Sequence, residues 1–240
     1  MTILAIETST HVCSAALAHN GSIVAARIDR ETGNHAKQLP VFIDELLQIA
    51  RQQQLQIEAV ALSEGPGSYT GLRIGTATAK GLCYGFNIPL IPIPTTEVLC
   101  AGAKKHFSSF TYHLSPLIDA RRMEVYTALY DADIKPLTPI QAVVVESRES
   151  LISNSDSGLT SNSEAVYYFG DGAAKCREIL ESDTWHFLPD FIPDAANMFD
   201  LAEQYLVKGK ACKTAVELAY YEPFYLKEFV AAKSHIKGLT

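Results

Sequence analysis

Short apolar runs and longer amphipathic segments alternate along the chain. Apolar residues dominate 3–6, 13–17 and 59–62, and runs of this length are typical of buried strands. Asn20-Gly21, soon after the second run, is a characteristic hairpin turn. From His35 to Gln53 the apolar residues instead recur at helical spacing, which predicts an amphipathic helix. This alternation of strands and helices indicates an α/β fold.

The same order of elements occurs a second time. Ile6-Glu7-Thr8 aligns with Ile118-Asp119-Ala120, and in both places an apolar strand ends in a carboxylate, turns and returns. A glycine turn follows a later strand in each half, Gly65-Pro66-Gly67 in the first and Gly170-Asp171-Gly172 in the second. Matching order at low identity favours an internal duplication.

We therefore predict a duplicated α/β fold in which two mixed sheets are flanked by helices. The pattern is interrupted by Ala, Gly, Lys and Ser residues shortly after residue 100, so we place subdomains at 1–104 and 105–240. The C-terminal tail carries an apolar stretch, and we expect it to pack back on the first subdomain.

The segment after the first glycine turn is helix-like but rich in small residues. Gly71, Gly75 and Ala79 are spaced i, i+4 and so lie on one helix face. Each glycine inside a helix costs roughly 0.5–1 kcal/mol relative to Ala. The missing side chains therefore indicate the close approach of another backbone, either that of the chain's own sheet or that of a partner's helix.

The composition is that of an ordinary globular protein. Of 240 residues, 48% are hydrophobic and 20% are charged. The 20 basic and 27 acidic side chains give a net charge of −7, which disfavours nucleic-acid binding by this chain alone. Five cysteines form no CxxC pair, so we expect reduced thiols. The N-terminus opens into an apolar strand and no run of about 18 apolar residues occurs, so we expect a cytoplasmic protein without a membrane segment.

Five motifs follow one another along nearly the whole chain. They are LAIETST at Leu4 to Thr10, GPGSYTGLRIG at Gly65 to Gly75, AKGL at Ala79 to Leu82, IDARRMEVY at Ile118 to Tyr126, and EPFYL at Glu222 to Leu226. Together they resemble the TsaB (YeaZ) family. Two positions depart from the family's usual pattern, since Glu7 stands where Asp is common and Met123 where Gly is common. The resemblance implies the duplicated fold of actin, the sugar kinases and the Hsp70 ATPase.

The resemblance also implies a supporting role in tRNA modification. The family serves bacterial synthesis of threonylcarbamoyladenosine on tRNAs that read codons beginning with A. Its members do not carry the chemistry, but pair with a homologous catalytic subunit, TsaD, and work with the ATPase TsaE. We therefore expect a non-catalytic scaffold without a cofactor of its own, which meets tRNA only through the complex and forms a homodimer when alone.

We predict the partner surface on two neighbouring helices. The helix from His35 has more apolar surface than one core requires, and the small-residue face of the next helix favours close contact. Two such helices from each subunit would form a four-helix bundle. The predicted interface residues are His35, Leu39, Phe42, Ile43, Leu46, Gly71, Arg73, Gly75 and Ala79. On this hypothesis, Gly75→Arg separates the subunits and leaves the chain folded.

The first alternative is a nucleotide-binding ATPase or kinase of the same fold. Hydroxyls and turn amides suit phosphate, and the candidate residues are Thr8, Ser9, Thr10, Gly65, Gly67, Gly170 and Gly172. The second hairpin opposes this reading, because Arg121 and Arg122 stand near the place where glycine usually lets the backbone approach phosphate. A nucleotide held at a subunit interface is a further form of this alternative.

The second alternative is a metallopeptidase-like homologue of the old glycoprotease type. Metal ligation on a helix requires two histidines spaced i, i+4, so that both rings lie on one face. His35 opens a predicted helix, but Leu39 occupies position i+4, and no other histidine pair has helical ligand spacing. We therefore predict no metal site and no catalytic residue.

Overall fold

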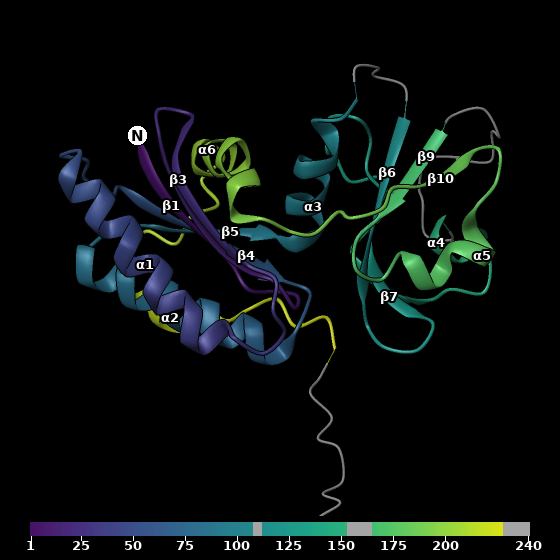
Figure 1. The fold of residues 1–240 in the computed structure, drawn as a ribbon, viewed down its shortest axis with the longest axis horizontal. Coiled ribbons are helices and arrows are strands. Elements are labelled where there is room, and N and C mark those ends of the chain that lie inside the picture. Colours follow the sequence, from purple (N-terminus) through teal and green to yellow (C-terminus); the bar gives the residue numbers. More distant parts are fainter. Residues whose placement is uncertain (108–111, 153–164, 228–240) are drawn as a thin grey trace, which may run out of the picture.

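The computed structural model describes residues 1–107, 112–152 and 165–227, which build two five-stranded sheets side by side (Figure 1). The first sheet has the order β3-β2-β1-β4-β5 and the second has the order β10-β9-β6-β7-β8. The first contains β1 (Thr2–Glu7), β2 (Cys13–His19), β3 (Ser22–Asp29), β4 (Ala59–Gly65) and β5 (Leu90–Pro94). The second contains β6 (Tyr112–Asp119), β7 (Glu124–Thr127), β8 (Gln141–Val144), β9 (Ala165–Phe169) and β10 (Trp185–Phe187).

The strands of the two sheets pair in the same order and direction, which confirms the duplication. β1 pairs antiparallel with β2 and parallel with β4, while β6 pairs antiparallel with β7 and parallel with β9. The predicted hairpin turn also holds, because Asn20 and Gly21 both adopt positive φ, 50° and 76°. Glu7 and Asp119 therefore end equivalent central strands.

Helices cover both faces of the first sheet. α1 (His35–Gln52) and α2 (Tyr69–Phe86) pack on one face and lie together on the outer side of the molecule (Figure 1). Apolar residues of α1 at helical spacing, such as Leu39 and Leu46, are fully buried against this face. The other face is covered by η2 (Ala195–Asn197) and α6 (Phe199–Val207). Ala202 of α6 and Met198, which joins the two helices, belong to the same core cluster as Ile3.

α3 (Thr95–Lys104) lies between the two sheets (Figure 1). Its Val98 packs with the core of the first sheet, while Leu99, Cys100 and Ala103 pack with the second. The opposite face of the second sheet carries three short helices, α4 (Glu149–Ile152), η1 (Ala174–Cys176) and α5 (Arg177–Leu180).

The chain returns to the first subdomain after β10. α6, α7 (Ala215–Tyr220) and residues 221–227 all pack against it, and the Phe224 N–H donates to the Glu64 carbonyl at 2.8 Å. We call residues 221–227 the C-terminal strap. The division at residue 104 thus separates the two sheets, but residues 195–227 lie with the first. None of the described helices has both the length and the apolarity that a bilayer crossing needs.

Candidate functional site

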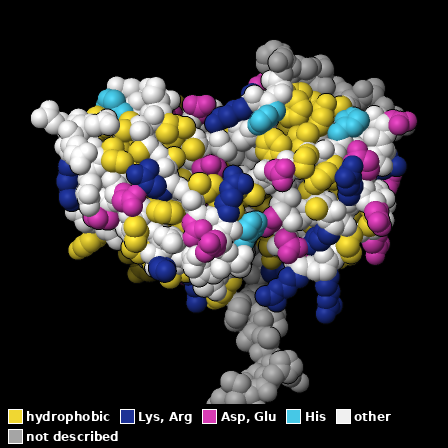
Figure 2. Space-filling view, viewed as in Figure 1, with side chains coloured by type: hydrophobic (Ala, Val, Ile, Leu, Met, Phe, Trp, Pro, Cys, Tyr) yellow, Lys and Arg dark blue, Asp and Glu magenta, His cyan; other side chains and the backbone are white. Residues whose placement is uncertain are grey.

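A cleft of 1110 Å³ lies where the two subdomains meet. Its walls come from the turns after β1, β4, β6 and β9, the start of α1 and the C-terminal strap. Charged side chains of both signs gather along this boundary (Figure 2). Across this boundary the side chains of His11, in the turn after β1, and Asp171, in the turn after β9, approach to 3.9 Å. The first hairpin turn therefore faces the glycine turn of the second half.

The carboxylate at the end of β1 does not line the cleft. Glu7 is 0% exposed, and its Oε1 accepts a 2.5 Å hydrogen bond from the Ser9 N–H. Glu7 Oε2 has no hydrogen-bond partner among the described residues. Burial raises the pKa of this carboxyl to about 7, although hydrogen bonds from Ser63 and Ser9 oppose the shift. The carboxylate that ends β1 is thus an interior group.

The N-terminal part of α2 is what closes this turn. The Ser9 carbonyl accepts from the Ser68 N–H at 2.6 Å, and Thr8 Oγ1 donates to the Gly71 carbonyl at 2.8 Å. A Cβ on Gly71 would lie 2.0 Å from the Thr8 carbonyl oxygen, and one on Gly75 would lie 2.2 Å from Thr8 Oγ1. The backbone whose close approach the glycines permit is therefore that of the chain's own β1 turn.

The turn after β6 is built differently. Asp119 is exposed, pairs with Lys175, and accepts from the Arg121 N–H at 3.2 Å. Arg121 and Arg122 both have positive φ, 72° and 49°, in the left-handed region that costs a side-chain-bearing residue roughly 1–2 kcal/mol. Burial raises the pKa of Asp171, whose Oδ1 accepts from the Asp119 N–H at 3.0 Å. This turn presents charged side chains instead of bare backbone.

The predicted nucleotide residues are only partly brought together. Ser9, Thr10 and Gly67 line the cleft, whereas Thr8, Gly65, Gly170 and Gly172 do not. A Cβ on Gly65 would lie 2.6 Å from the Phe224 carbonyl oxygen, and one on Gly170 would lie 2.5 Å from that of Leu117. The glycines thus serve internal packing. With Glu7 buried and two arginines on the second turn, these residues do not fit a phosphate cradle.

His35 lies at the wall of the cleft but is nearly buried. It is 8% exposed, and its Nε2 lies 3.1 Å from the Val12 carbonyl oxygen. In residues 1–107, 112–152 and 165–227, no three His, Cys, Asp or Glu side chains are grouped so that they could hold a metal ion. The histidine therefore links α1 to the segment before β2.

The predicted interface residues lie mostly on the wrong side of their helices, and this corrects the sequence hypothesis. Only Phe42, half-buried, and Arg73, exposed, are accessible to a partner. The others are buried within the chain. Leu39, Ile43, Leu46 and Ala79 belong to the core of the first sheet, Gly71 and Gly75 lie against Thr8, and His35 lies at the cleft wall beside Val12. Gly75→Arg would consequently disrupt the fold instead of separating subunits.

The residues that sequence reasoning missed lie on the opposite side of the same helices. Ala77, Gly81 and Gly85 form a second i, i+4 row on α2, and a Cβ on Gly81 or Gly85 would meet no atom within 4 Å. Tyr84 beside this row is 78% exposed, and Val41 on α1 is 48% exposed. We call this side, from Arg73 to Gly85, the outer face of α2.

Comparisons with known proteins agree with this architecture. The model of the family described as tRNA N6-adenosine threonylcarbamoyltransferase, TsaD, matches residues 24–234. The tRNA threonylcarbamoyladenosine biosynthesis protein TsaB of Bacillus subtilis (strain 168) is 32% identical over 184 residues, 75% of this chain and 76% of that protein. TsaB of Escherichia coli (strain K12) is 30% identical over 236 residues, 97% of each protein. The chain belongs to the TsaB family.

The solved structures give the same fold for a TsaB-family relative. YeaZ from Pseudomonas aeruginosa superposes with a TM-score of 0.76 at 21% identity, over 94% of this chain and 99% of that one. The expected family and the duplicated fold of two mixed sheets are thereby confirmed. The TsaD family model matches as well, which places this TsaB-family chain and TsaD on a common fold.

Proposed function

We propose that this chain is the non-catalytic TsaB subunit of tRNA threonylcarbamoyladenosine synthesis. It pairs in the cytoplasm with a TsaD-type catalytic subunit, works with TsaE, and meets tRNA through the complex. The observation that carries the proposal is the similarity to two TsaB proteins named for this pathway, one of them over 97% of both chains.

The chemistry of the two turns supports a role without catalysis. The β1 carboxylate is sealed under α2, and the β6 turn carries Arg121 and Arg122 in place of a glycine cradle. His35 is bonded inside the fold and has Leu39 at the position where a second ligand would stand. The described residues thus offer a supporting surface more readily than a reaction centre.

The outer face of α2, with the neighbouring exposed side of α1, is the surface we assign to TsaD. Small residues at Ala77, Gly81 and Gly85 let a partner helix approach closely, while Tyr84 and Val41 supply apolar area that is bare in this chain. The arrangement keeps the two-helix interface of the sequence hypothesis but turns each helix to its other side. The same face would mediate a homodimer when TsaD is absent.

Reconstitution tests the function. A mixture of TsaD, TsaE, threonylcarbamoyl-adenylate, ATP and tRNA is assayed for modified adenosine with and without this chain. We expect modification only when the chain is added, and none from the chain with tRNA and threonylcarbamoyl-adenylate alone. Full modification without the chain would remove the proposed role. Titration of the isolated chain with ATP then asks whether a nucleotide binds without a partner, and we expect no binding.

The surface assignment has its own pair of variants. Gly81→Arg places a long side chain on the outer face where no atom lies within 4 Å of the new Cβ, so the chain should fold and lose TsaD. Val207→Arg, at a position that is 88% exposed on α6, is the matched control and should keep TsaD. Circular dichroism checks folding, and size-exclusion chromatography with TsaD reads the complex. Equal binding by both variants would place the interface elsewhere.

A further inference from the structure

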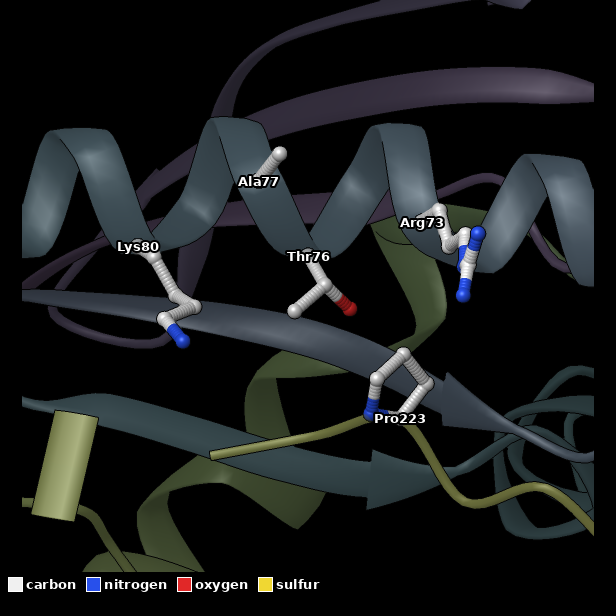
Figure 3. Close-up of a pocket in the computed structure, with 5 residues that line it drawn as sticks. All are labelled: Arg73, Thr76, Ala77, Lys80 and Pro223. Carbon is white, nitrogen blue, oxygen red and sulfur yellow. The ribbon is translucent and has the colours of Figure 1, made fainter. Parts of the chain in front are cut away.

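A small pocket of 470 Å³ lies on the outer face of α2, apart from the cleft. Arg73, Thr76, Ala77 and Lys80 of α2 line one side, and Pro223 of the C-terminal strap lines the other (Figure 3). The pocket therefore combines two cations and a hydroxyl with a small apolar wall.

Arg73 is held in place before any ligand arrives. Its guanidinium lies 4.2 Å from the centre of the Tyr69 ring, and its Nε donates to the Tyr225 hydroxyl at 3.3 Å. The two outer nitrogens have no hydrogen-bond partner among the described residues. An arginine fixed in this way presents a planar fork that suits two oxygens of one acid group.

Thr76 adds a donor that the fold leaves unused. Thr76 is 6% exposed, and its Oγ1 has no hydrogen-bond partner in the described part of the chain. Figure 3 shows this hydroxyl pointing toward Pro223, on the side of Arg73. A buried hydroxyl without a partner costs free energy, which a ligand oxygen in the pocket would recover.

Lys80 builds the far end of the pocket. Its Nζ donates to the carbonyls of Ala219 at 2.8 Å and Tyr221 at 3.1 Å, which holds the strap over α2. Lys80 Nζ therefore already donates two hydrogen bonds within the chain, and Arg73 supplies the main uncompensated charge of the pocket. Glu222 is near enough to interact with Arg73, and this disfavours a multiply charged ligand such as a polyphosphate.

We propose that this pocket receives one carboxylate, from an Asp or Glu side chain on a helix of the TsaD-type partner. The Arg73 fork takes the two oxygens, and Thr76 Oγ1 donates to one of them. A protein carboxylate fits because the neighbouring row of Ala77, Gly81 and Gly85 lets a helix backbone come close enough to bring a short acidic side chain inside. The proposal rests on the proposed function and adds the chemistry that selects the partner.

Binding of TsaD by isothermal titration calorimetry tests the fork. Arg73→Gln should weaken the complex by about tenfold to hundredfold, because a bidentate charged pair is lost. Arg177→Gln is the matched control, since Arg177 also stacks on an aromatic ring, that of Phe187 at 5.4 Å, but lies in the second subdomain. Equal weakening by the two variants, or none by Arg73→Gln, would overturn the proposal.

Thr76→Val separates a binding role from a structural one. Removing an unpartnered buried hydroxyl should raise the melting temperature of the free chain and yet weaken TsaD binding by about fivefold. Thr78→Val is the control, because Thr78 Oγ1 already donates to the Ile74 carbonyl at 2.9 Å, and it should not raise the melting temperature. A Thr76→Val chain that binds TsaD as well as wild type contradicts the proposal.

The partner's carboxylate is identified by a mutant cycle. Each Asp and Glu on TsaD's facing helices is changed to its amide, and one change should weaken binding to wild type but not to Arg73→Gln. Titration of the isolated chain with inorganic phosphate tests whether the pocket binds a phosphate instead of a carboxylate. Millimolar phosphate binding that Arg73→Gln abolishes would overturn the carboxylate assignment. If wild type fails to bind TsaD at all, the proposed function fails. If wild type binds but no such carboxylate exists, only this inference fails.

Discussion

The ends of β1 and β6 occupy the same place in the duplicated fold and have opposite surroundings. Glu7 is fully buried beneath α2, and one of its oxygens lacks a partner among the described residues. Asp119 is exposed beside the cleft and is paired with Lys175. A duplicated backbone therefore does not carry duplicated chemistry, because what packs on each turn decides whether its carboxylate is interior or accessible.

The covering helices explain the difference. After β4 the chain forms α2, which runs over 18 residues and begins directly on the β1 turn. After β9 the equivalent segment is only η1 and α5, with three and four residues. Gly71 lets α2 settle onto the first turn, whereas Gly172 supports a shorter cover that leaves the second turn in the cleft.

Gly71→Ala should break the first turn. Its Cβ would lie 2.0 Å from the Thr8 carbonyl oxygen, so we expect the free energy of unfolding to fall by about 4 kcal/mol, although alanine normally favours helix. Gly81→Ala on the exposed side of α2 meets no atom and should raise it by about 0.5–1 kcal/mol. Urea denaturation followed by circular dichroism measures both. If the two variants changed the free energy of unfolding in the same direction, the contact between residue 71 and Thr8 would be unimportant.

Glu7→Gln should change how stability depends on pH. The pKa of Glu7 is raised from 4.5 to about 7 in the folded chain, so the folded state holds this proton more tightly than the unfolded state. The contribution of the protonated Glu7 carboxyl to the free energy of unfolding is therefore fully present below pH 4.5 and is lost as pH rises through about 7. The amide should remove that loss, which amounts to about 3 kcal/mol at pH 8.

A matched control for the pH effect is available in the same subdomain. Burial also raises the pKa of Glu64 to about 7, so part of the pH dependence of the unfolding free energy should remain in Glu7→Gln and decrease further when Glu64→Gln is added. Denaturant midpoints from pH 4 to pH 9 give the comparison. If Glu7→Gln does not reduce the pH dependence of the unfolding free energy, the Glu7 carboxyl is not an interior group with a raised pKa.

Gly172→Ala sharpens the comparison in the second half. Its Cβ would lie 3.0 Å from backbone atoms of Leu117, Ile118 and Asp119, a tighter contact than usual but looser than at Gly71. We expect a loss of about 1–2 kcal/mol in the free energy of unfolding. A loss as large as that of Gly71→Ala in the same urea experiment would mean that both turns are equally sealed.

Arg122→Gly should give the smallest effect, with the opposite sign. Arg122 has φ of 49°, which glycine adopts without the steric cost that a Cβ brings. We expect the free energy of unfolding to rise by about 0.5–1 kcal/mol. The measurement is again the urea midpoint. A decrease would show that contacts of the arginine side chain outweigh the strain of its backbone.

Much of the fold was predictable because local patterns determine it. Strand lengths, the Asn20-Gly21 turn and the order of the glycine turns depend on neighbouring residues and indicated the duplicated plan. The family was indicated by the resemblance of five motifs. Which face of α2 is interior and which is exposed was not predictable in the same way. Two rows at i, i+4 spacing, one through Gly75 and one through Gly81, look alike until the long-range approach of Thr8 selects the first as interior.

One signal in the sequence favoured the other row. Polar Thr70, Arg73 and Lys80 flank the row through Gly81, and polar neighbours indicate the solvent side of a helix. The burial of Glu7 had no such signal, because a carboxylate at a strand end looks the same whether or not a helix later covers it. The pocket at Arg73 was equally hidden, since Pro223 comes from a segment 150 positions along the sequence.

The return of the chain after β10 sets an order of events during synthesis. Ile3 and Ala5 are translated long before Met198 and Phe199, which are among the side chains that cover them. One face of the first sheet therefore stays bare while the second subdomain is being translated. A nascent chain stalled before residue 195 should bind chaperones through that face, and release should follow once α6 has emerged from the ribosome.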